Sequence, residues 1–422
     1  MGAPDEISVS EPDGHAGTPR QFDVAIVGGG LVGASLALAL EGSAVRVLLI
    51  EGVEPGSSEQ PSFDERTTAL GNASRRIFEA LGVWDELARE AAPVRTIHVS
   101  EAGRFGSARL RAAEQGVEAF GYVIPNRLIG AALWRALKRA SGVTLRMPAR
   151  VGAVQIATDG AALTVLDAAG AVETASARLL VAADGANSIV RAAAGIEAQV
   201  EDYAQVAITA AVMSDRPQDG TAYERFTSSG PVAVLPLHGG GYGTVWACEP
   251  GRAAELLELS DAAYLSALQE RFGWRAGRFL HIGRRASYPL RLSRAAATVG
   301  LRTVLVGNAA QGLHPIAGQG FNLGLRDAAL LAERIAAGGA DPGTPELLTA
   351  YSQARAADRG GVVHFTDSLV KLFASQLPGA SLLRNLGLLV FDLSPPAKRA
   401  LARVSLGFGG PTPRLARGLP LA

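Results

Sequence analysis

A glycine-rich turn near the N-terminus has the residue types and spacing that bind a pyrophosphate. Residues 28–33 read Gly-Gly-Gly-Leu-Val-Gly and match G-x-G-x-x-G. Gly28 permits the tight bend, Gly30 lets phosphate oxygens approach the backbone, and Gly33 lets the following helix pack closely. The start of that helix presents free N–H groups and the positive end of a dipole to the phosphates. Glu51, after a second predicted strand, can accept hydrogen bonds from ribose hydroxyls.

The segments around this turn form a complete unit. Phe22–Val27 is a short apolar run typical of a buried parallel strand, and Ala34–Leu40 has the small residues of a closely packed helix. Val45–Ile50 predicts a second strand that ends at Glu51. A strand, glycines, a helix, a strand and an acid in this order favour a dinucleotide-binding unit over an ordinary glycine turn. The unit alone does not distinguish NAD from FAD.

Two further turns follow apolar strand patterns later in the chain. Asp184 and Gly185 come directly after the predicted strand Arg178–Ala183, at the carboxyl end where open α/β sheets place ligands. An Asp-Gly pair alone is equally typical of an ordinary turn. After the predicted strand Thr303–Val306, residues 307–320 are rich in glycine and amides and lead into a predicted helix. Such a loop presents a second helix dipole, which suits a polar, electron-rich ring edge.

The composition excludes several other classes of site and partner. Cys248 is the only cysteine, which excludes an internal disulfide framework and cysteine-based metal sites. We predict no metal site and interpret His314 as structural, because no H-x-x-x-H or H-E-x-x-H spacing occurs. The 40 Lys and Arg residues balance the 40 Asp and Glu residues, which argues against a nucleic-acid partner. A chain of 422 residues with 48% hydrophobic residues can form two or three structural units.

The ends of the chain bear on its location. Residues 1–20 contain four acids and one arginine, which differs from a transit peptide and predicts a loose tail on a cytoplasmic bacterial protein. The uncharged stretch Val24–Leu40 is too short and too rich in glycine to span a membrane. Ser381–Leu393 predicts a leucine-rich helix that would line an apolar tunnel, lie on the inner membrane, or simply pack on the core.

The three turns in this order resemble those of the class A flavoprotein aromatic hydroxylases. Residues 304–327 are especially similar to the ubiquinone-biosynthesis branch and, within it, to the 2-octaprenyl-6-methoxyphenol hydroxylases. The resemblance covers residues 22–410 and includes the stretches 63–70, 81–87, 223–237, 271–274 and 366–373.

This resemblance implies an α/β fold. It consists of an FAD-binding Rossmann-like domain of the glutathione-reductase type, an inserted, mainly antiparallel β-sheet substrate domain, and C-terminal helices. Independently, alternating patterns in residues 206–213, 232–237 and 242–248 predict antiparallel strands, with a hairpin turn at 239–243. We expect a tail at 1–20, an FAD-binding domain from 21–95, 125–195 and 295–350, a substrate domain from 96–124 and 196–294, and a helical segment at 351–422.

The resemblance also implies that FAD binds along the three turns. Asn308 stands where most of the superfamily has an aspartate that contacts the ribityl chain. The amide of Asn308 can still donate and accept hydrogen bonds, but it lacks the negative charge of an aspartate. The sequence therefore does not specify how strongly FAD binds. Arg66 and Arg127 would contact the cofactor, with surface ion pairing as the alternative for each. The residues expected to bind FAD are Gly28, Gly30, Gly33, Glu51, Arg66, Arg127, Asp184, Asn308, Gly318, Gly320, Phe321 and Asn322.

The implied activity is hydroxylation of a polyprenylated phenol in ubiquinone biosynthesis, with NADH or NADPH, O2 and a C4a-hydroperoxyflavin. Pro315 would lie against the flavin face, and N–H groups near Gly318 and Gly320 would stabilise charge on the reduced ring. No residue can be named as the base for the phenol. Other interpretations are a hydroxylase of another aromatic or isoprenoid substrate, a reductase or oxidase, or a non-catalytic flavin-binding scaffold. Association with a multi-enzyme complex or a second copy stays open.

Overall fold

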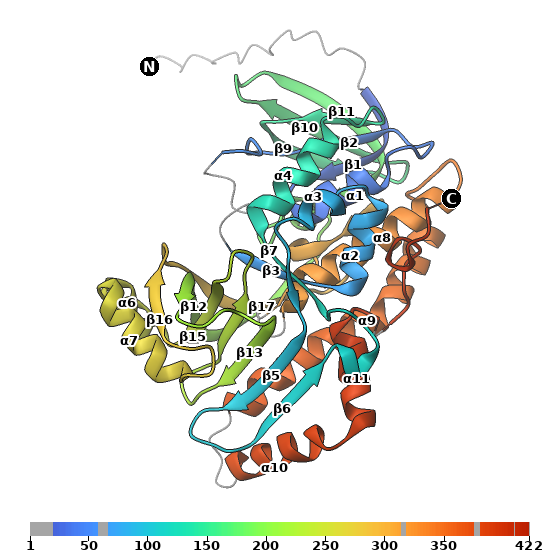
Figure 1. Ribbon diagram of the computed structural model, residues 1–422. Coiled ribbons are helices and arrows are strands. Elements are labelled where there is room, and N and C mark those ends of the chain that lie inside the picture. Colours follow the sequence, from blue (N-terminus) through green and yellow to red (C-terminus); the bar gives the residue numbers. More distant parts are fainter. Residues whose placement is uncertain (1–19, 58–65, 314–317, 375–379, 409, 422) are drawn as a thin grey trace, which may run out of the picture.

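The computed structural model of the chain describes residues 20–57, 66–313, 318–374, 380–408 and 410–421. A mainly parallel sheet forms the upper half of the molecule in Figure 1, and a mainly antiparallel sheet lies at the lower left. The C-terminal helices lie along the right-hand and lower sides. This mixed α/β arrangement confirms the fold class that the sequence predicts.

The first sheet has a parallel centre in the order β19-β11-β1-β2-β8. All four residues of β2 are apolar and buried, as expected of a strand covered on both faces. Strands β9 and β10 extend β11 as an antiparallel group, and β18 pairs with β19. The strands are β1 (Arg20–Val27), β2 (Val47–Ile50), β8 (Val143–Arg146), β9 (Ala149–Ile156), β10 (Ala161–Asp167), β11 (Val172–Ala182), β18 (Val299–Gly300) and β19 (Thr303–Leu305).

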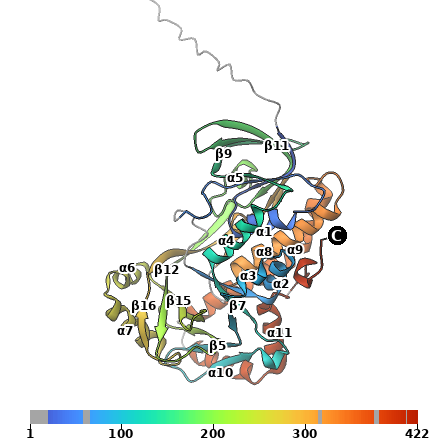
Figure 2. The same ribbon diagram turned by 45° about the horizontal axis from the view of Figure 1, so that its top comes forward.

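Alternate residues of β1 enter two different cores. Val24 and Ile26 pack with helices α1 (Leu31–Ala39), α4 (Asn126–Leu137) and α8 (Gln319–Ala337). Ala25 and Val27 pack instead against β9 and β10. Figure 2 shows α1, α4 and α8 together on one side of the β9–β11 strands. The parallel sheet is therefore a rigid layer between helices and a second β layer, with its turns held at one edge.

The second sheet is mostly antiparallel, except that β13 and β5 run parallel. Helices α6 (Pro250–Glu258) and α7 (Asp261–Phe272) cover one of its faces, where Tyr264 packs edge-on against Trp246. Its other face borders the cavity described below. Its strands are β20 (Gln311–Gly312), β17 (Ala286–Ala295), β12 (Ala198–Ser214), β15 (Tyr242–Cys248), β14 (Val232–Pro236), β13 (Thr221–Phe226), β5 (Thr96–Glu101), β6 (Ser107–Arg111) and β16 (Phe279–Ile282).

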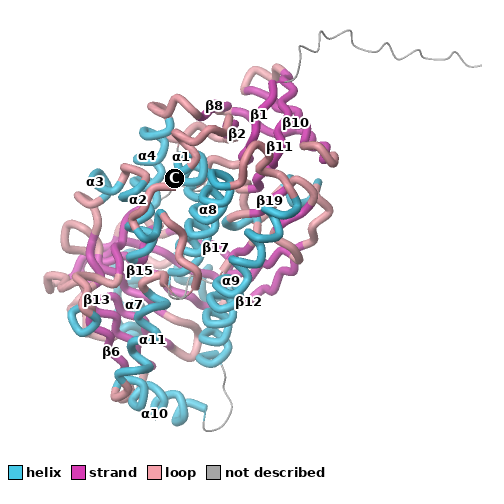
Figure 3. The backbone as a smooth tube through the Cα atoms, turned by 90° about the vertical axis from the view of Figure 1, so that its right-hand side faces the viewer, coloured by secondary structure: helices cyan, strands magenta, loops and turns pink. Residues whose placement is uncertain are grey.

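A small third sheet and further helices join these two halves. Helix α10 lies at the end of the molecule opposite β1 and β10 (Figure 3). None of the helices in the described part of the chain combines the length and apolarity needed to cross a bilayer. The remaining elements are β3 (Thr67–Gly71), β4 (Ala92–Val94), β7 (Gly121–Pro125), α2 (Asn72–Ala80), α3 (Trp84–Leu87), α5 (Ile189–Ala193), α9 (Pro345–Ala374), α10 (Ala380–Asp392), α11 (Pro395–Ser405), and the 3-10 helices η1 (Ala113–Gln115), η2 (Gly307–Ala309) and η4 (Leu415–Arg417).

Candidate functional site

The first turn leaves the N-terminus of α1 free. Gly28 has φ +100°, and a Cβ added there would lie 2.4 Å from the carbonyl oxygen of Ala183. Gly30 is the N-cap of α1, with no side-chain cap and no acid in the first turn. The helix begins at Leu31, three residues earlier than the sequence predicts, because the glycines themselves form its entry. The first-turn N–H groups of α1 have no acceptor within the helix and can bind an anionic ligand, whereas the N–H of Gly28 already donates to the carbonyl oxygen of Ile50 at 2.8 Å.

Gly33 serves packing rather than contact with a ligand. A Cβ at this position would lie 1.9 Å from the carbonyl oxygen of Gly28 and 3.1 Å from the Cβ of Ala183. Gly33 is absent from the cavity wall, whereas Gly28 and Gly30 line it. The close approach of helix and strand thus needs glycine here.

Glu51 ties the two sides of the first turn together. Its Oε2 accepts a hydrogen bond from the N–H of Gly29 at 2.6 Å, and its Oε1 accepts one from the N–H of Val53 at 2.9 Å. The side chain of Trp134 donates from Nε1 to the carbonyl oxygen of Gly29 at 3.0 Å. Glu51 is only 8% exposed and lines the cavity, so its carboxylate is held in place beside any ligand there. Trp134 was missed by sequence reasoning because its partner lies 105 residues away.

Asp184 has one occupied and one unused carboxylate oxygen. Its Oδ2 accepts hydrogen bonds from the N–H groups of Ile189 at 2.8 Å and Val190 at 3.3 Å, at the start of α5. Its Oδ1 is buried and has no hydrogen-bond partner among the described residues. Asp184 lines the same cavity as Glu51. A ligand hydroxyl would satisfy this oxygen, which fits the ribose or ribityl part of a dinucleotide.

The third turn leads from β19 to α8. Gly307 and Gly318 both have positive φ values, +58° and +59°, and Gly318 caps α8 in the left-handed conformation. Asn308 is exposed on η2 and lines the cavity, together with Gly318, Gly320 and Phe321. Pro315 and His314 lie outside the described residues.

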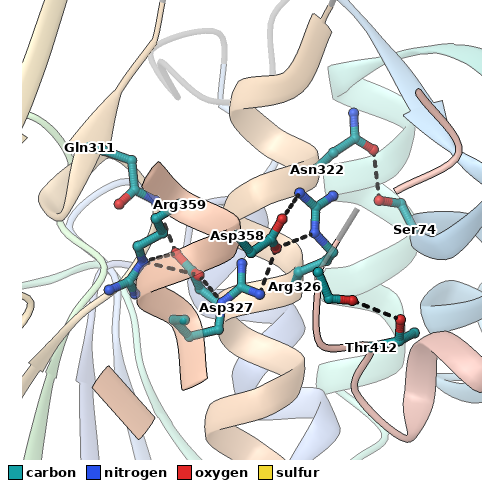
Figure 4. Close-up of polar contacts among 10 residues, drawn as sticks. Ser74, Gln311, Asn322, Arg326, Asp327, Asp358, Arg359 and Thr412 are labelled. Carbon is teal, nitrogen blue, oxygen red and sulfur yellow. Dashed lines mark hydrogen bonds and ion pairs between the residues drawn. The ribbon is translucent and has the colours of Figure 1, made fainter. Parts of the chain in front are cut away.

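The side-chain amide of Asn322 makes four hydrogen bonds to other segments of the chain. It is 2% exposed and is absent from the cavity wall. Its Oδ1 accepts from the N–H of Gly71 at 2.8 Å and the hydroxyl of Ser74 at 2.7 Å. Its Nδ2 donates to the carbonyl oxygens of Ala69 at 2.8 Å and Gly318 at 2.7 Å. Asn322 therefore fixes the loop from β3 to α2 against the entry of α8 (Figure 4).

The two candidate arginines lie in different environments. Arg66 lines the cavity, and its guanidinium lies 5.2 Å from the ring centroid of Tyr288 on β17. Arg127 is exposed on α4 and is not part of the cavity wall, although its neighbour Asn126 is. The structure thus brings Arg66, but not Arg127, into the cavity.

All three turns meet in one cavity of about 2450 Å³ between the two large sheets. Gly30, Asp184 and Gly318, one residue from each turn, line it. From there the cavity continues along the second sheet to α10 and α11, where Leu388 and Phe391 form part of its wall. The space therefore combines a polar part at the turns with a long apolar part.

A buried ion cluster behind α8 was not predicted. Asp327 accepts from the guanidinium groups of Arg355 at 2.6 Å and Arg359 at 3.2 Å, and from the side-chain amide of Gln311 at 2.9 Å. Beside it, Arg326 donates to the carboxylate of Asp358 at 2.9 Å (Figure 4). The cluster fixes α8, which carries the third turn, to α9. The adjacent Arg326-Asp327 pair and the arginines four residues apart on α9 were its only sequence signals.

Comparison with known proteins gives one family and several full-length relatives. Residues 21–366 match the family described as "FAD binding domain". Ubiquinone hydroxylase UbiL of Rhodospirillum rubrum is 39% identical over 406 residues, which cover 94% of this chain and 93% of that protein. The 3-demethoxyubiquinol 3-hydroxylase of Escherichia coli is 33% identical over 398 residues, which cover 92% of this chain and all of that protein.

Solved structures share the fold. The p-nitrophenol 4-monooxygenase PnpA from Pseudomonas putida DLL-E4 aligns with a TM-score of 0.76 at 20% identity, over 93% of this chain and 99% of that chain. The flavin-dependent monooxygenase PieE, determined with FAD and substrate, aligns with a TM-score of 0.69 at 20% identity, over 93% of this chain and 72% of that chain.

Proposed function

The chain belongs to the class A flavoprotein hydroxylases of ubiquinone biosynthesis, and from this premise we propose that it hydroxylates the ring of a polyprenylated phenol with NAD(P)H and O2. It is an FAD-dependent monooxygenase. The observation that carries the finer proposal is the single cavity, whose polar end is formed by the three turns and whose apolar end reaches α10.

The residues at the polar end fit FAD. The N-terminus of α1, capped by Gly30, suits a pyrophosphate, and Glu51 and the unused Oδ1 of Asp184 suit ribose and ribityl hydroxyls. Residues 318–321, at the N-terminus of α8, would face the ring edge. When bound, FAD accepts a hydride from NAD(P)H and activates O2 for transfer to an aromatic ring. The chain binds and orients the cofactor and the substrate, and it excludes water from the site.

The apolar end fits the tail of the substrate. The cavity wall beyond the turns is formed by the second sheet, α10 and α11, and it is mainly apolar. Leu388 and Phe391 on α10 face this space. A polyprenyl chain would bury its methylene and methyl groups here at about 0.8 kcal/mol for each CH2 group. A hydroxylase of another aromatic or isoprenoid substrate is the alternative, and it would use the same space.

Helix α10 supports a peripheral site on the inner membrane. Leu386, Leu389, Val390 and Leu393 recur at i, i+3, i+4 and i+7 and are 40–74% exposed. The same helix lines the cavity with its other side, so a lipid-dissolved substrate could pass along it without crossing water. Exposed Arg399 on α11 adds a cation that favours anionic lipid.

A turnover assay on the FAD-loaded full chain tests the proposed function. The chain is supplied with NADH or NADPH, O2 and 2-prenylphenol, and the product is analysed by mass spectrometry. We expect one oxygen atom from 18O2 in the product for each NAD(P)H oxidised. A yellow protein that never oxidises NAD(P)H would contradict this and favour a flavin-binding scaffold. Oxidation without oxygen insertion would favour a reductase or oxidase.

A further inference from the structure

We propose that Glu224 is the base that takes the proton from the phenolic hydroxyl of the substrate. The inference rests on the proposed function and adds a residue to it. The proton moves from the phenol oxygen to a carboxylate oxygen of Glu224, which leaves a phenolate and a carboxylic acid, and no electron is transferred. A phenolate ring is richer in electrons than a phenol ring, so it reacts more readily with an electrophilic oxygen.

Glu224 lies on β13 in the wall of the cavity. Its cross-strand neighbours are Val99 of β5 and Ala233 of β14, and Ala233 is in turn paired with Val245 of β15. All three neighbours also line the cavity, and none has a polar side chain. The carboxyl group is therefore a single charged group within an apolar part of the sheet that faces the substrate space.

A series of contacts places Glu224 beside the loop expected to hold the flavin ring. Ala222, two residues earlier on the same face of β13, belongs to a hydrophobic cluster against which Ala69 packs. A Cβ at Gly318 would lie 3.2 Å from the Cβ of Ala69, so the entry of α8 borders that cluster. Two residues along a strand span about 7 Å. Glu224 thus borders the part of the cavity where a substrate ring and the entry of α8 would meet.

Within the described residues, the carboxyl group of Glu224 has no partner that would give it a structural role. No hydrogen bond or ion pair of Glu224 is present there, whereas the carboxylate of Asp327 has two arginine partners. Burial raises the pKa of Glu224 to about 7, with no opposing charge. A base with a pKa near the working pH is partly ionised and is well suited to accept a proton. Glu224 is only partly buried and lines the cavity, so its carboxylate is accessible to a ligand there.

Other titratable groups lie on β13 and on the neighbouring strand β5. On β13 itself, Tyr223 and Arg225 alternate with Glu224; the Tyr223 ring packs on the α6–α7 side of the sheet, 5.6 Å from His98, although Tyr223 is also part of the cavity wall. On β5, Glu101 is paired in register with Phe226 and so lies on the same face of the sheet as Glu224, but it is not part of the cavity wall.

The other walls near Glu224 contribute no charge. Helices α10 and α11 contribute only apolar residues, glycine and Ser405 to the cavity. The remaining charged groups of the cavity lie in two regions. One region consists of the turns and β9 of the first half, and the other consists of β17, four places from β13 in the strand order, with the segments beside it. These groups are Glu51, Arg66, Arg150, Asp184, Arg284 and Arg291.

The test compares Glu224→Gln with the wild-type chain and with Glu258→Gln, which removes the same charge from an exposed position on α6. All three are studied as FAD-loaded full chains with 2-prenylphenol from pH 5.5 to 10. For the wild type and E258Q we expect the hydroxylation rate to rise with pH through about 7, as Glu224 ionises. For E224Q we expect a loss of about 100-fold or more at pH 7, with a rise only near pH 10, where the phenol ionises by itself.

A second substrate separates a base from a residue that only shapes the cavity. A fluorinated 2-prenylphenol with a more acidic hydroxyl should shift the pH profile of E224Q downward and restore most of its rate at pH 8. Equal losses for E224Q on both phenols, or an unchanged pH profile, would overturn the inference. Unaltered FAD absorbance, phenol affinity and NAD(P)H-driven flavin bleaching show that E224Q is folded. If E224Q does not fold, E224D replaces it: this variant should fold, hydroxylate more slowly than the wild type, and keep the rise of its rate near pH 7. A wild-type chain that hydroxylates neither phenol contradicts the proposed function instead.

Discussion

The side-chain oxygen of Asn322 accepts a hydrogen bond from the backbone N–H of Gly71 at 2.8 Å, although 251 residues separate them. This bond and its companions to Ser74, Ala69 and Gly318 connect β3, α2 and the entry of α8 through one buried amide. The loop and the helix terminus that would enclose the flavin ring are therefore fixed to each other. Their relative position depends on an amide that can donate and accept at the same time.

We expect Asn322→Ala to destabilise the chain and weaken FAD binding. It leaves two donors and two acceptors unpaired in a buried place, which predicts a loss of about 3 kcal/mol in the free energy of unfolding. FAD affinity should fall at least tenfold, because the loop and the helix entry can then separate. Denaturant unfolding and fluorescence titration with FAD measure the two effects. Asn322→Asp keeps both accepted bonds and loses both donated ones, so it should fall between; an alanine variant with wild-type FAD affinity would contradict the coupling.

The first turn provides a test of packing without a change of charge. Gly33→Ala places a Cβ 1.9 Å from the carbonyl oxygen of Gly28, so α1 must move away from β1. We expect the purified variant to be largely free of FAD and to unfold at lower denaturant. Gly251→Ala on α6 is the control, because a Cβ there meets nothing within 4 Å. This variant should retain FAD, and its free energy of unfolding should rise by at most about 1 kcal/mol. Retention of FAD by G33A would show that the turn tolerates displacement of the helix.

The first turn was predictable because its constraints are local. The tight bend, the free helix terminus and the close packing at Gly33 all arise within one short segment, so the residue types alone indicate them. The buried strand Val47–Ile50 and the hairpin between β14 and β15 were predictable for the same reason, since periodicity and turn residues specify them.

Residues that act through distant neighbours were beyond prediction from one sequence. The side chain of Asn322 is one example, because its four partners come from β3, α2 and the residue that caps α8. Alternation along β13 places Glu224 opposite Tyr223, yet only the strand order shows which face meets the cavity. Trp134 and Arg355 likewise gain their roles from segments that the sequence does not place beside them.

The ion cluster between α8 and α9 predicts a dependence of stability on acid. Burial alone would raise the pKa of Asp327, but the charges of Arg359 and Arg355 outweigh it and hold the pKa below 3.8. A carboxyl group with a depressed pKa stabilises the fold above its unfolded pKa of about 4, and this contribution is lost as pH falls through the folded pKa. The contribution of Asp327 to the free energy of unfolding, measured from pH 7 to 2.5, should therefore stay constant down to about pH 4 and then fall.

Asp327→Asn should remove that part of the acid dependence. It also leaves two buried guanidinium groups without their shared carboxylate. We therefore expect the free energy of unfolding to fall by about 3–5 kcal/mol at pH 7. Asp261→Asn, at an exposed ion pair on α7, should change stability by less than about 1 kcal/mol. If D327N loses no more than D261N, the cluster does not hold α8 against α9.

Helix α10 gives the last prediction, which concerns the membrane. Glutamate at Leu389 and Val390, which are 40% and 66% exposed, places two carboxylates on the face that would meet lipid. We expect the wild-type chain to float with vesicles that contain anionic phosphatidylglycerol, and L389E/V390E to lose at least tenfold in vesicle affinity, because it loses apolar burial and gains repulsion. Leu280→Glu on β16, also 40% exposed, is the matched control and should float like the wild type. Turnover of a short-tailed phenol in detergent should stay unchanged in L389E/V390E, since Leu388 and Phe391, on the other side of α10, line the cavity. Equal flotation of all three proteins would show that this face packs against something other than lipid, and a multi-enzyme partner would then be the occupant to seek.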